Sequence, residues 1–414
     1  MGFPISSSPT MNLPAPGSLL PPLPPTVTAF HDNFQQGGNS GDVLQMASIE
    51  RDLMETDFYR RHIEWLEQSK YYRNAFEKLS EMAPDSFSLA KAVYLVENAY
   101  MDNQIPYTAF IQSIKQKADH VKQIIKREGL TVKNNTALNY GIQKLYSQQN
   151  PYYNAAIRQT FLIKPLTYRF EDFQGEKDYT NMFVTKLLVT SKGQCHSLPL
   201  LYLLIAEQLG AKASLSLAPQ HSFIKFQGSN GRLYNFECTN GSIVSNTWIT
   251  QSGYITAKAL QNHTYFDTLS QRQLYAQMVT DLMLGYLKKF PYDDFAEAMR
   301  QKVLTINPGN VQALIVGANV QTRLAMAKMK SVGTPQPDAL PQYPEAYKAY
   351  LTMQSCYERV EATGYQDMPA EAYQKWLQSI QQEKKKQATT EAQQRLEREI
   401  HELKKGTFKT SPIH

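Results

Sequence analysis

One stretch of the chain combines a thiol, an imidazole and a carboxylate in an order that suits nucleophilic catalysis. Cys195 comes first, His221 follows it, and Glu237 comes after a glycine-rich turn. A thiolate can attack a carbonyl carbon, an imidazole can carry the proton, and a carboxylate can fix the imidazole tautomer and support its charged form. These residue types predict a Cys-His-acid catalytic triad formed by Cys195, His221 and Glu237.

A helix is expected to position the thiol. Apolar residues recur at helical spacing after Gly193, and Gly210 is typical of a helix end. We therefore expect Cys195 in the first turn of a helix, where the backbone N–H groups and the helix dipole lower the pKa of a thiol. Pro199 has no N–H for the carbonyl four residues back, a loss that is better tolerated near a helix start than in a helix interior.

A hairpin is expected to position the imidazole and the carboxylate. The turn signal Gly-Ser-Asn-Gly at 228–231 separates two extended patterns, at 221–226 and 233–238, and another short alternating run precedes them. His221 would begin one strand and Glu237 would lie near the end of the next, so the hairpin would bring them side by side. A helix that leads into a small antiparallel sheet is typical of an α+β fold.

Other residues compete for roles in the same site. Asn235 shares a strand face with Glu237, and a Cys-His-Asn arrangement would follow the same orienting logic. His196 lies roughly 100° around the helix from Cys195, so we expect it to be structural or to contact substrate. The backbone N–H of Cys195 is the expected oxyanion donor, and Gln194 is a candidate for the second donor.

The cysteine count argues against other uses of these thiols. The chain has three cysteines, which are too few and too scattered for a disulfide framework or a zinc ribbon. We expect Cys238 and Cys356 to pack as small apolar side chains. Cys195, His196 and His221 match no zinc spacing, so the sequence predicts neither a metal nor a cofactor.

The stretch resembles the transglutaminase-like superfamily of papain-type cysteine enzymes. The resemblance covers about 180–330 and rests on Gly193-Gln194-Cys195, the apolar helix that ends in Leu209-Gly210, His221 at a strand start, and an acid after a glycine turn. It implies acyl transfer, with Cys195 as nucleophile, His221 as base and Glu237 as orienting acid. The chain departs from the family at the acid, which is usually an aspartate and so one methylene shorter.

The helices that follow suggest a more specific group. Ala296 and Asn307-Pro308 match parts of the tetratricopeptide pattern. With the preceding core, they resemble a bacterial subgroup that appends tetratricopeptide-like repeats. The expected fold is α+β, with a transglutaminase-like core, a helical N-terminal region and a tetratricopeptide-like helical C-terminal region.

Composition shifts divide the chain further. Helical patterns at 107–128 and 136–147 mark the N-terminal part as mostly α, and the last helix is rich in Gln, Glu and Lys, which is typical of a solvated face. We expect five segments: a disordered Pro/Gly/Ser-rich lead-in (1–46), a helical N-terminal region (47–150), the transglutaminase-like core (151–268), a tetratricopeptide-like helical region (269–375) and a charged helical tail (376–414).

Charge and hydropathy exclude some classes of partner. The 414 residues include 43 Lys and Arg against 37 Asp and Glu, a net charge of +6 that is not gathered into a basic block, so nucleic acid is not implied. The apolar runs fall far short of the ~18 residues that a membrane span needs. The low cysteine content suits the cytoplasm, and it equally suits a bacterial envelope or periplasmic protein.

Two functions remain open from the sequence. The first is a cysteine acyl-transfer enzyme that attacks an amide of a protein or peptide substrate and forms a thioester. The second is a catalytically inert scaffold whose helical repeats bind a protein partner. A Cys195 sealed from solvent, or held beyond reach of His221 with no movable element, would favour the second.

Overall fold

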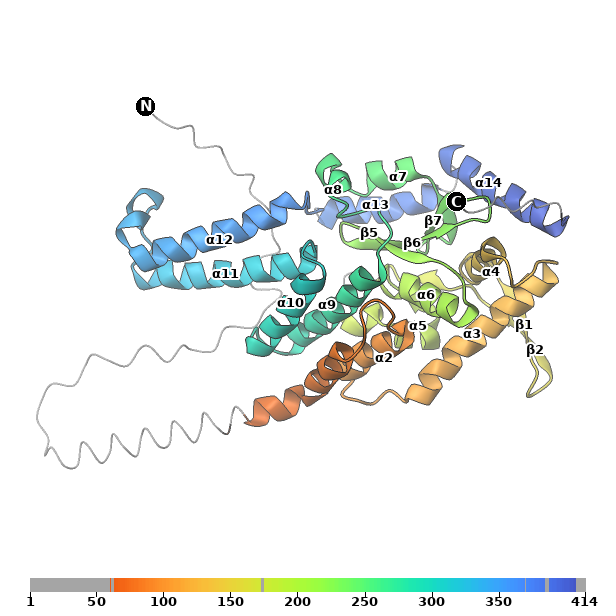
Figure 1. Ribbon diagram of the computed structural model, residues 1–414, viewed down its shortest axis with the longest axis horizontal. Helices are drawn as coiled ribbons and strands as arrows, with labels where there is room; N and C mark the ends of the chain where they lie inside the picture. Colours follow the sequence, from red (N-terminus) through yellow and green to blue (C-terminus); the bar gives the residue numbers. More distant parts are fainter. Residues whose placement is uncertain (1–59, 61–62, 173–174, 369, 384–386, 407–414) are drawn as a thin grey trace, which may run out of the picture.

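The structure is a computed structural model that describes residues 60, 63–172, 175–368, 370–383 and 387–406. The predicted lead-in at 1–46 lies outside the described residues. From residue 63 the first described helix runs to residue 80, inside the predicted helical N-terminal region at 47–150. The fold is a mixture of helix and sheet, with helical regions on both sides of a small central sheet (Figure 1).

The central sheet has four antiparallel strands in sequence order. They are β5 (Ser214–Ala218), β6 (His221–Gln227), β7 (Leu233–Glu237) and β8 (Ser242–Val244). β6 and β7 form the predicted hairpin around the glycine-rich turn, and Gln227 pairs with Leu233 at its closed end. The sequence analysis did not anticipate β8, which pairs with β7.

The helix that follows Cys195 is the centre of the fold. α6 (Ser197–Leu209) is buried without a break from Ser197 to Ala206. A helix that is apolar on all sides must be covered on all sides, and α6 contacts α2, α3, α4, α5 and the sheet. Gly210 ends it in the left-handed conformation, as predicted.

Helices from the N-terminal part surround α6. The predictions of helices at 107–128 and 136–147 are confirmed by α3 and α4. The elements of this part are α2 (Leu89–Tyr100), α3 (Tyr107–Arg127), α4 (Asn135–Ser147), β1 (Asn150–Asn154), β2 (Gln159–Ile163), β3 (Thr167–Tyr168), the 3-10 helix η1 (Tyr179–Met182), α5 (Val184–Thr190) and β4 (Lys192–Gly193).

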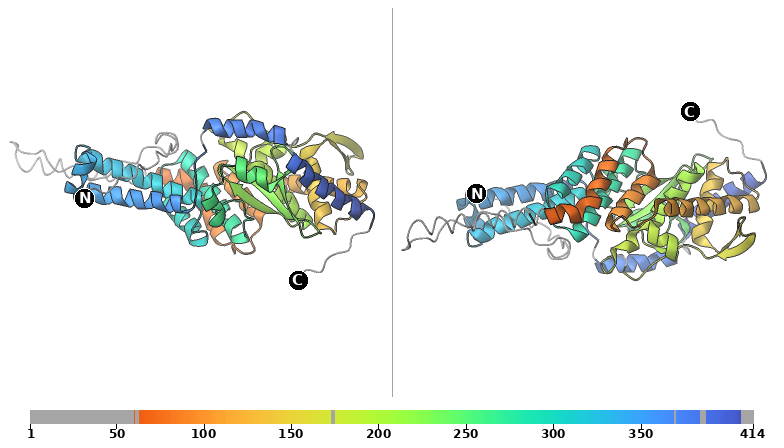
Figure 2. Two further views of the ribbon diagram at one scale, coloured as in Figure 1. Left: turned by 90° about the horizontal axis from the view of Figure 1, so that it is seen from above. Right: turned by 90° about the horizontal axis from the view of Figure 1, so that it is seen from below.

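Helices make up the rest of the described chain. They are α7 (Asn246–Ser252), α8 (Ala257–Gln261), α9 (Gln271–Lys289), α10 (Asp294–Ile306), α11 (Val311–Ser331), η2 (Pro337–Gln342), α12 (Pro344–Ala362), α13 (Ala370–Glu383) and α14 (Gln387–Lys404). α11 and α12 pack against each other and project from one end of the molecule (Figure 2). α13 then lies back beside the sheet, next to α7.

The last two helices are more than a solvated tail. α13 buries Tyr373 and Trp376, and α14 buries Leu396 and Ile400, all within the main hydrophobic core. Glu399 of α14 is also buried, where it accepts hydrogen bonds from the Thr136 hydroxyl, the Ser229 N–H and the Tyr234 hydroxyl. The prediction of a solvated helix therefore describes only the outer face of this segment.

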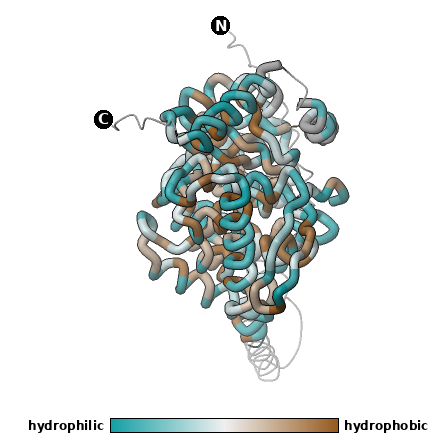
Figure 3. Tube along the Cα trace, turned by 90° about the vertical axis from the view of Figure 1, so that its right-hand side faces the viewer, coloured by the Kyte–Doolittle hydropathy of each residue, from teal (hydrophilic) through white to brown (hydrophobic). Residues whose placement is uncertain are grey.

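One hydrophobic core runs through the described chain, from Tyr72 in the first described helix to Ile400 in α14. Figure 3 shows hydrophobic and hydrophilic residues alternating along the helices, as expected for amphipathic helices packed on a common core. The division into five segments stays a prediction. Within the residues described, no helix is both long and apolar enough to span a membrane.

Candidate functional site

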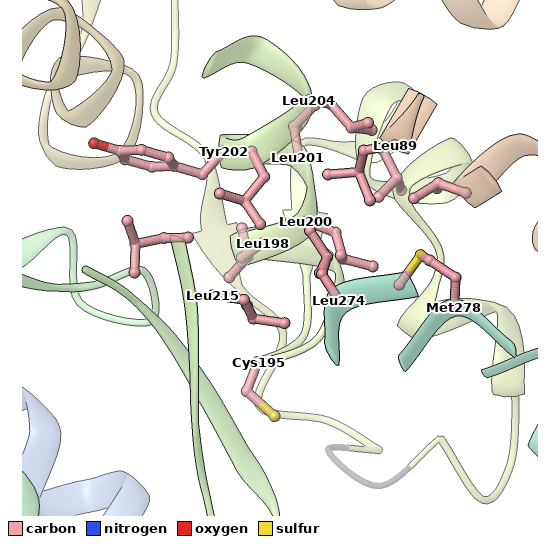
Figure 4. Close-up of a cluster of buried hydrophobic side chains, with 14 of the residues drawn as sticks. Leu89, Cys195, Leu198, Leu200, Leu201, Tyr202, Leu204, Leu215, Leu274 and Met278 are labelled. Carbon is pink, nitrogen blue, oxygen red and sulfur yellow. The ribbon is translucent and has the colours of Figure 1, made fainter. Parts of the chain in front are cut away.

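Cys195 lies immediately before α6. The prediction that it occupies the first turn is wrong by a short distance, because the N-cap is His196 and the helix begins at Ser197. The Leu198 N–H nevertheless bonds to the Gln194 carbonyl at 3.0 Å, so the helical hydrogen-bond pattern already starts beside the cysteine. Figure 4 shows Cys195 at the edge of the leucine-rich cluster around α6, with its sulfur pointing away from the labelled leucines.

The carbonyl of Cys195 has an unusual partner. In a regular helix it would accept the N–H four residues on, but that residue is Pro199, which has none. The Ser222 hydroxyl donates to this carbonyl instead, at 2.5 Å. Ser222 is the neighbour of His221 on β6. The hydrogen bond that replaces the missing N–H of Pro199 therefore links the segment of Cys195 to the strand that carries the imidazole.

His221 and Glu237 form a buried pair. Nε2 of His221 lies 2.7 Å from Oε2 of Glu237, and the second carboxylate oxygen accepts the Thr239 N–H at 2.8 Å. The pairing of Ile224 with Phe236 implies that His221 faces residue 239, so Glu237 is its diagonal neighbour. A diagonal pair is wider than a direct one, and the glutamate side chain, one methylene longer than aspartate, spans it.

The pKa values of the three groups shift in a concerted way. Burial raises the pKa of the Cys195 thiol, but the interaction with His221 outweighs it and the pKa lies below its ordinary value. Burial lowers the pKa of His221, but the Glu237 carboxylate and Cys195 raise it by more, so that the pKa is about 10. Burial raises the pKa of Glu237, yet His221 holds it below its ordinary value. Each of the three shifts is in the direction that favours the charged form of its group, which is a thiolate at Cys195, an imidazolium at His221 and a carboxylate at Glu237.

The ring of His221 is set up for proton exchange. Nε2 is committed to Glu237, whereas Nδ1 is buried and has no hydrogen-bond partner within the described part of the chain. Nδ1 is therefore the ring nitrogen that is not committed to Glu237, and Cys195 is among the groups that raise the pKa of His221.

The buried cysteine Cys238 offers a comparison within the same chain. Both Cys195 and Cys238 are buried free thiols. Burial raises the pKa of Cys238 well above its ordinary value, and the negative charge of Glu237 adds to the rise. Burial raises the pKa of both thiols. The pKa of Cys195 is lowered nevertheless, and this lowering comes from its neighbours, chiefly His221.

The competing candidates lie elsewhere. Asn235 donates its side-chain amide to Asn246 Oδ1 at 2.6 Å, and it is Glu237 that contacts His221. Gln194 donates its amide to the carbonyls of Arg169 and Asp172, so that amide is engaged in holding the 169–172 loop.

His196 points to another partner. Its Nε2 lies 3.0 Å from Asp281 Oδ2 on α9, and its Nδ1 lies 3.1 Å from the Met182 carbonyl. Burial lowers the pKa of His196, but Asp281 raises it to about 9. The resulting positive charge further lowers the pKa of the Cys195 thiol. A small pocket adjoins this pair and is lined in part by Glu97, His196 and Asp281.

Two aromatic residues of α13 complete the surroundings, and sequence reasoning missed both. The Tyr373 hydroxyl lies 3.5 Å from the Cys195 sulfur. The Trp376 ring meets the His221 ring edge to face, with centroids 4.4 Å apart. The available signal was two large aromatics three residues apart, with Leu377 and Ile380 continuing the helical spacing, which marks one apolar face.

The site is closed in this structure, a feature that taken alone favours the inert scaffold over the enzyme. Cys195 is 7% exposed, His221 6% and Glu237 1%. The Gln220 carbonyl lies 3.7 Å from the sulfur, and α13 covers the sulfur and the imidazole ring. Among the described side chains, no group of three or more His, Cys, Asp or Glu is arranged to hold a metal ion.

One comparison with known proteins gave a match over part of the chain. Residues 109–280 match the family model described as the transglutaminase-like superfamily. The match runs from α3 into α9 and includes Cys195, His221 and Glu237, but it ends before α13. Searches of curated proteins and of solved structures gave no match. The fold class is therefore that of a transglutaminase-like domain flanked by helical regions, as predicted.

Proposed function

We propose that this protein is a cysteine acyl-transfer enzyme that acts on an amide of a protein or peptide substrate, either a peptide bond or a glutamine side chain. The observation that carries the proposal is the buried pair of His221 and Glu237, 2.7 Å apart, whose imidazole lowers the pKa of the buried Cys195 thiol. A buried thiol that only packs would follow Cys238, whose pKa is raised. Charged forms at neutral pH are what a thiolate mechanism requires.

The proposed reaction has two halves. In the first, the Cys195 sulfur attacks the amide carbonyl carbon, a C–S bond forms, and the carbonyl electron pair moves to oxygen, where the Cys195 N–H is the expected donor. The imidazolium of His221 then gives its proton to the departing nitrogen as the C–N bond breaks and a thioester remains. In the second half, His221 takes a proton from water or an amine, which attacks the thioester and releases the thiolate.

Glu237 supports this cycle without touching the substrate. Its hydrogen bond to Nε2 holds the ring, leaves Nδ1 free for proton transfer and stabilises the imidazolium each time it forms. Its second oxygen is held by the Thr239 N–H, so the carboxylate itself is fixed. Glu237 acts here as a positioning residue.

The proposal extends to the C-terminal helices. α9 to α12 follow one another along the chain, and α9 with α10 and α11 with α12 are packed pairs. Stacked helix pairs are the building unit of tetratricopeptide arrays. This arrangement supports, as part of the proposal, a tetratricopeptide-like region that binds a protein partner; that the enzyme is bacterial rests on the sequence resemblance alone.

Covalent labelling tests the proposal. The full chain is incubated with a library of glutamine-containing peptides that carry an electrophile, for long enough that transient opening of the closed site allows labelling, and the labelled residue is identified by mass spectrometry. We expect the label on Cys195, its loss in Cys195→Ala, and its retention in Cys238→Ala, which removes the matched buried thiol. Undiminished labelling of Cys195→Ala would overturn the assignment.

A further inference from the structure

Helix α13 occupies the space that a substrate would need. A carbonyl carbon must come within roughly 3–3.5 Å of the attacking atom. In this structure the Tyr373 hydroxyl oxygen is already 3.5 Å from the Cys195 sulfur. An amide therefore cannot reach the thiolate while Tyr373 keeps this position.

The second aromatic of α13 covers the base. Trp376 packs edge to face on the His221 ring and stacks on Trp248 of α7, with centroids 4.4 Å and 6.0 Å away. It also contacts Tyr373, at 5.5 Å between centroids. The two side chains form one aromatic plug over the thiol and the imidazole.

The helix is built to present this plug. Tyr373 and Trp376 are three residues apart and share a face, and both are buried. Glu371, Lys375 and Gln378 lie on the other side and are exposed. The helix thus meets the site through its aromatic face. Glu371, Lys375 and Gln378 on the opposite face are already in solvent.

The chain on the N-terminal side of α13 is fastened independently of the plug. The hydroxyl of Thr256 donates to the Gly364 carbonyl at 2.7 Å, and the hydroxyl of Thr264 donates to the Thr363 carbonyl at 2.7 Å. A Cβ on Gly364 would lie 2.3 Å from the Ala259 nitrogen, so this close approach requires glycine. The fixed point would stay in place if α13 moved.

The chain on the C-terminal side is fastened as well. Glu399 of α14 is held by Thr136, Ser229 and Tyr234, away from the thiol. On the N-terminal side, Gln220 also donates to Asp367 Oδ1 at 2.8 Å and links the residue before β6 to the segment before α13. α13 is thus a strap between two anchors.

We propose that α13 is an autoinhibitory strap whose Tyr373 and Trp376 block the site and must withdraw before a substrate reaches Cys195. The inference rests on the proposed function, since it assigns a regulation to that same site. A withdrawable strap explains why the site is closed in this structure although the neighbours of Cys195 favour its thiolate form. The strap belongs to the chain itself, so its displacement switches the enzyme on without any new residue entering the site.

The three cysteines of the chain provide the test. Full-length protein is treated with iodoacetamide, and the alkylation rate of each cysteine is followed by peptide mapping. Cys195 reports the site, the partly exposed Cys356 reports reagent reactivity, and the buried Cys238 reports unfolding. The double variant Tyr373→Ala/Trp376→Ala is compared with the wild type and with Glu371→Ala/Lys375→Ala, which alters only the exposed side of α13.

We expect at least about tenfold faster alkylation of Cys195 in the aromatic double variant, with Cys356 unchanged, Cys238 protected and the polar-side variant like wild type. Equal Cys195 rates in wild type and aromatic variant would overturn the strap. If Cys238 also reacts, the double variant has unfolded. The milder variant Trp376→Leu is then used, and its Cys195 alkylation rate is compared with that of the wild type in the same way.

Turnover of amide substrates separates this inference from the proposed function. Faster alkylation of Cys195 without turnover in the aromatic variant would uphold the strap and refute acyl transfer. Turnover at the same rate in wild type and variant, with equal alkylation, would uphold acyl transfer and refute the strap.

Discussion

The hydroxyl of Ser222 donates a 2.5 Å hydrogen bond to the carbonyl of Cys195. That carbonyl lacks its usual helical donor because residue 199 is proline. The bond joins the start of α6 to β6 and so holds the thiol next to His221. A hydrogen bond that the helix lacks is thus replaced by a tertiary hydrogen bond that positions residues of the site.

Removing this hydroxyl should destabilise the protein in a way that depends on Pro199. Ser222→Ala leaves a buried carbonyl without a donor, which costs about 1–3 kcal/mol of unfolding free energy. In a Pro199→Ala background the cost should shrink, because the new N–H at 199 reaches the Cys195 carbonyl by the regular helical bond. Urea denaturation of the four chains of this double-mutant cycle measures the coupling.

Ser216→Ala is the matched control for that cycle. Ser216 also lies in the sheet and donates to a backbone carbonyl, that of Phe266, at 2.8 Å. Its loss should cost the same with proline or alanine at 199. A Ser222→Ala cost that does not change with residue 199 would contradict the compensation of the proline by the serine hydroxyl.

The charge of Glu237 should set the acidic limit of Cys195 reactivity. Glu237→Gln keeps the size of the side chain but removes the charge that raises the pKa of His221. The thiolate then loses its stabilised counter-charge, and its pKa rises. Alkylation at pH 7 should slow by about tenfold for each unit of that rise, and the whole rate–pH profile should move to higher pH.

Asn235→Ala serves as the comparison for Glu237→Gln, because Asn235 lies on the same strand face but donates to Asn246. Its rate–pH profile should match that of the wild type. A profile that moves with Asn235→Ala and stays in place with Glu237→Gln would assign the orienting role to the asparagine.

The His196–Asp281 pair should stabilise the protein only below a defined pH. Asp281 contributes to raising the pKa of His196 from 6.5 to about 9. A raised folded-state pKa gives stability that is fully present below the unfolded value and is lost as the pH rises through the folded value. The difference in unfolding free energy between wild type and Asp281→Asn should therefore be large at about pH 6 and small above about pH 9.

The exposed pair of His263 and Asp267 provides the contrast. Its side chains are 78% and 53% exposed, so solvent screens the interaction. Asp267→Asn should change the unfolding free energy little at either pH. A pH-independent effect of Asp281→Asn would show that the carboxylate acts by packing or through Gln277, which also bonds to it.

The sequence by itself determined the order and the local shape of the site. Helical spacing with Gly210 at its end located α6, and a glycine-rich turn between alternating runs located the hairpin of β6 and β7. These are local features, since a helix or a hairpin is specified by residues close together in the chain. They were sufficient to select Cys195, His221 and Glu237 from the 414 residues.

Only the tertiary structure decided how these elements meet. The diagonal register let glutamate reach His221, docking of β6 brought Ser222 to the Cys195 carbonyl, and α13 returned across 178 residues to place Tyr373 on the sulfur. No periodicity encodes such contacts, because they depend on which apolar faces pack together across the whole core. The sequence thus determined a candidate nucleophile and its partners, while long-range packing decided that this structure holds them closed.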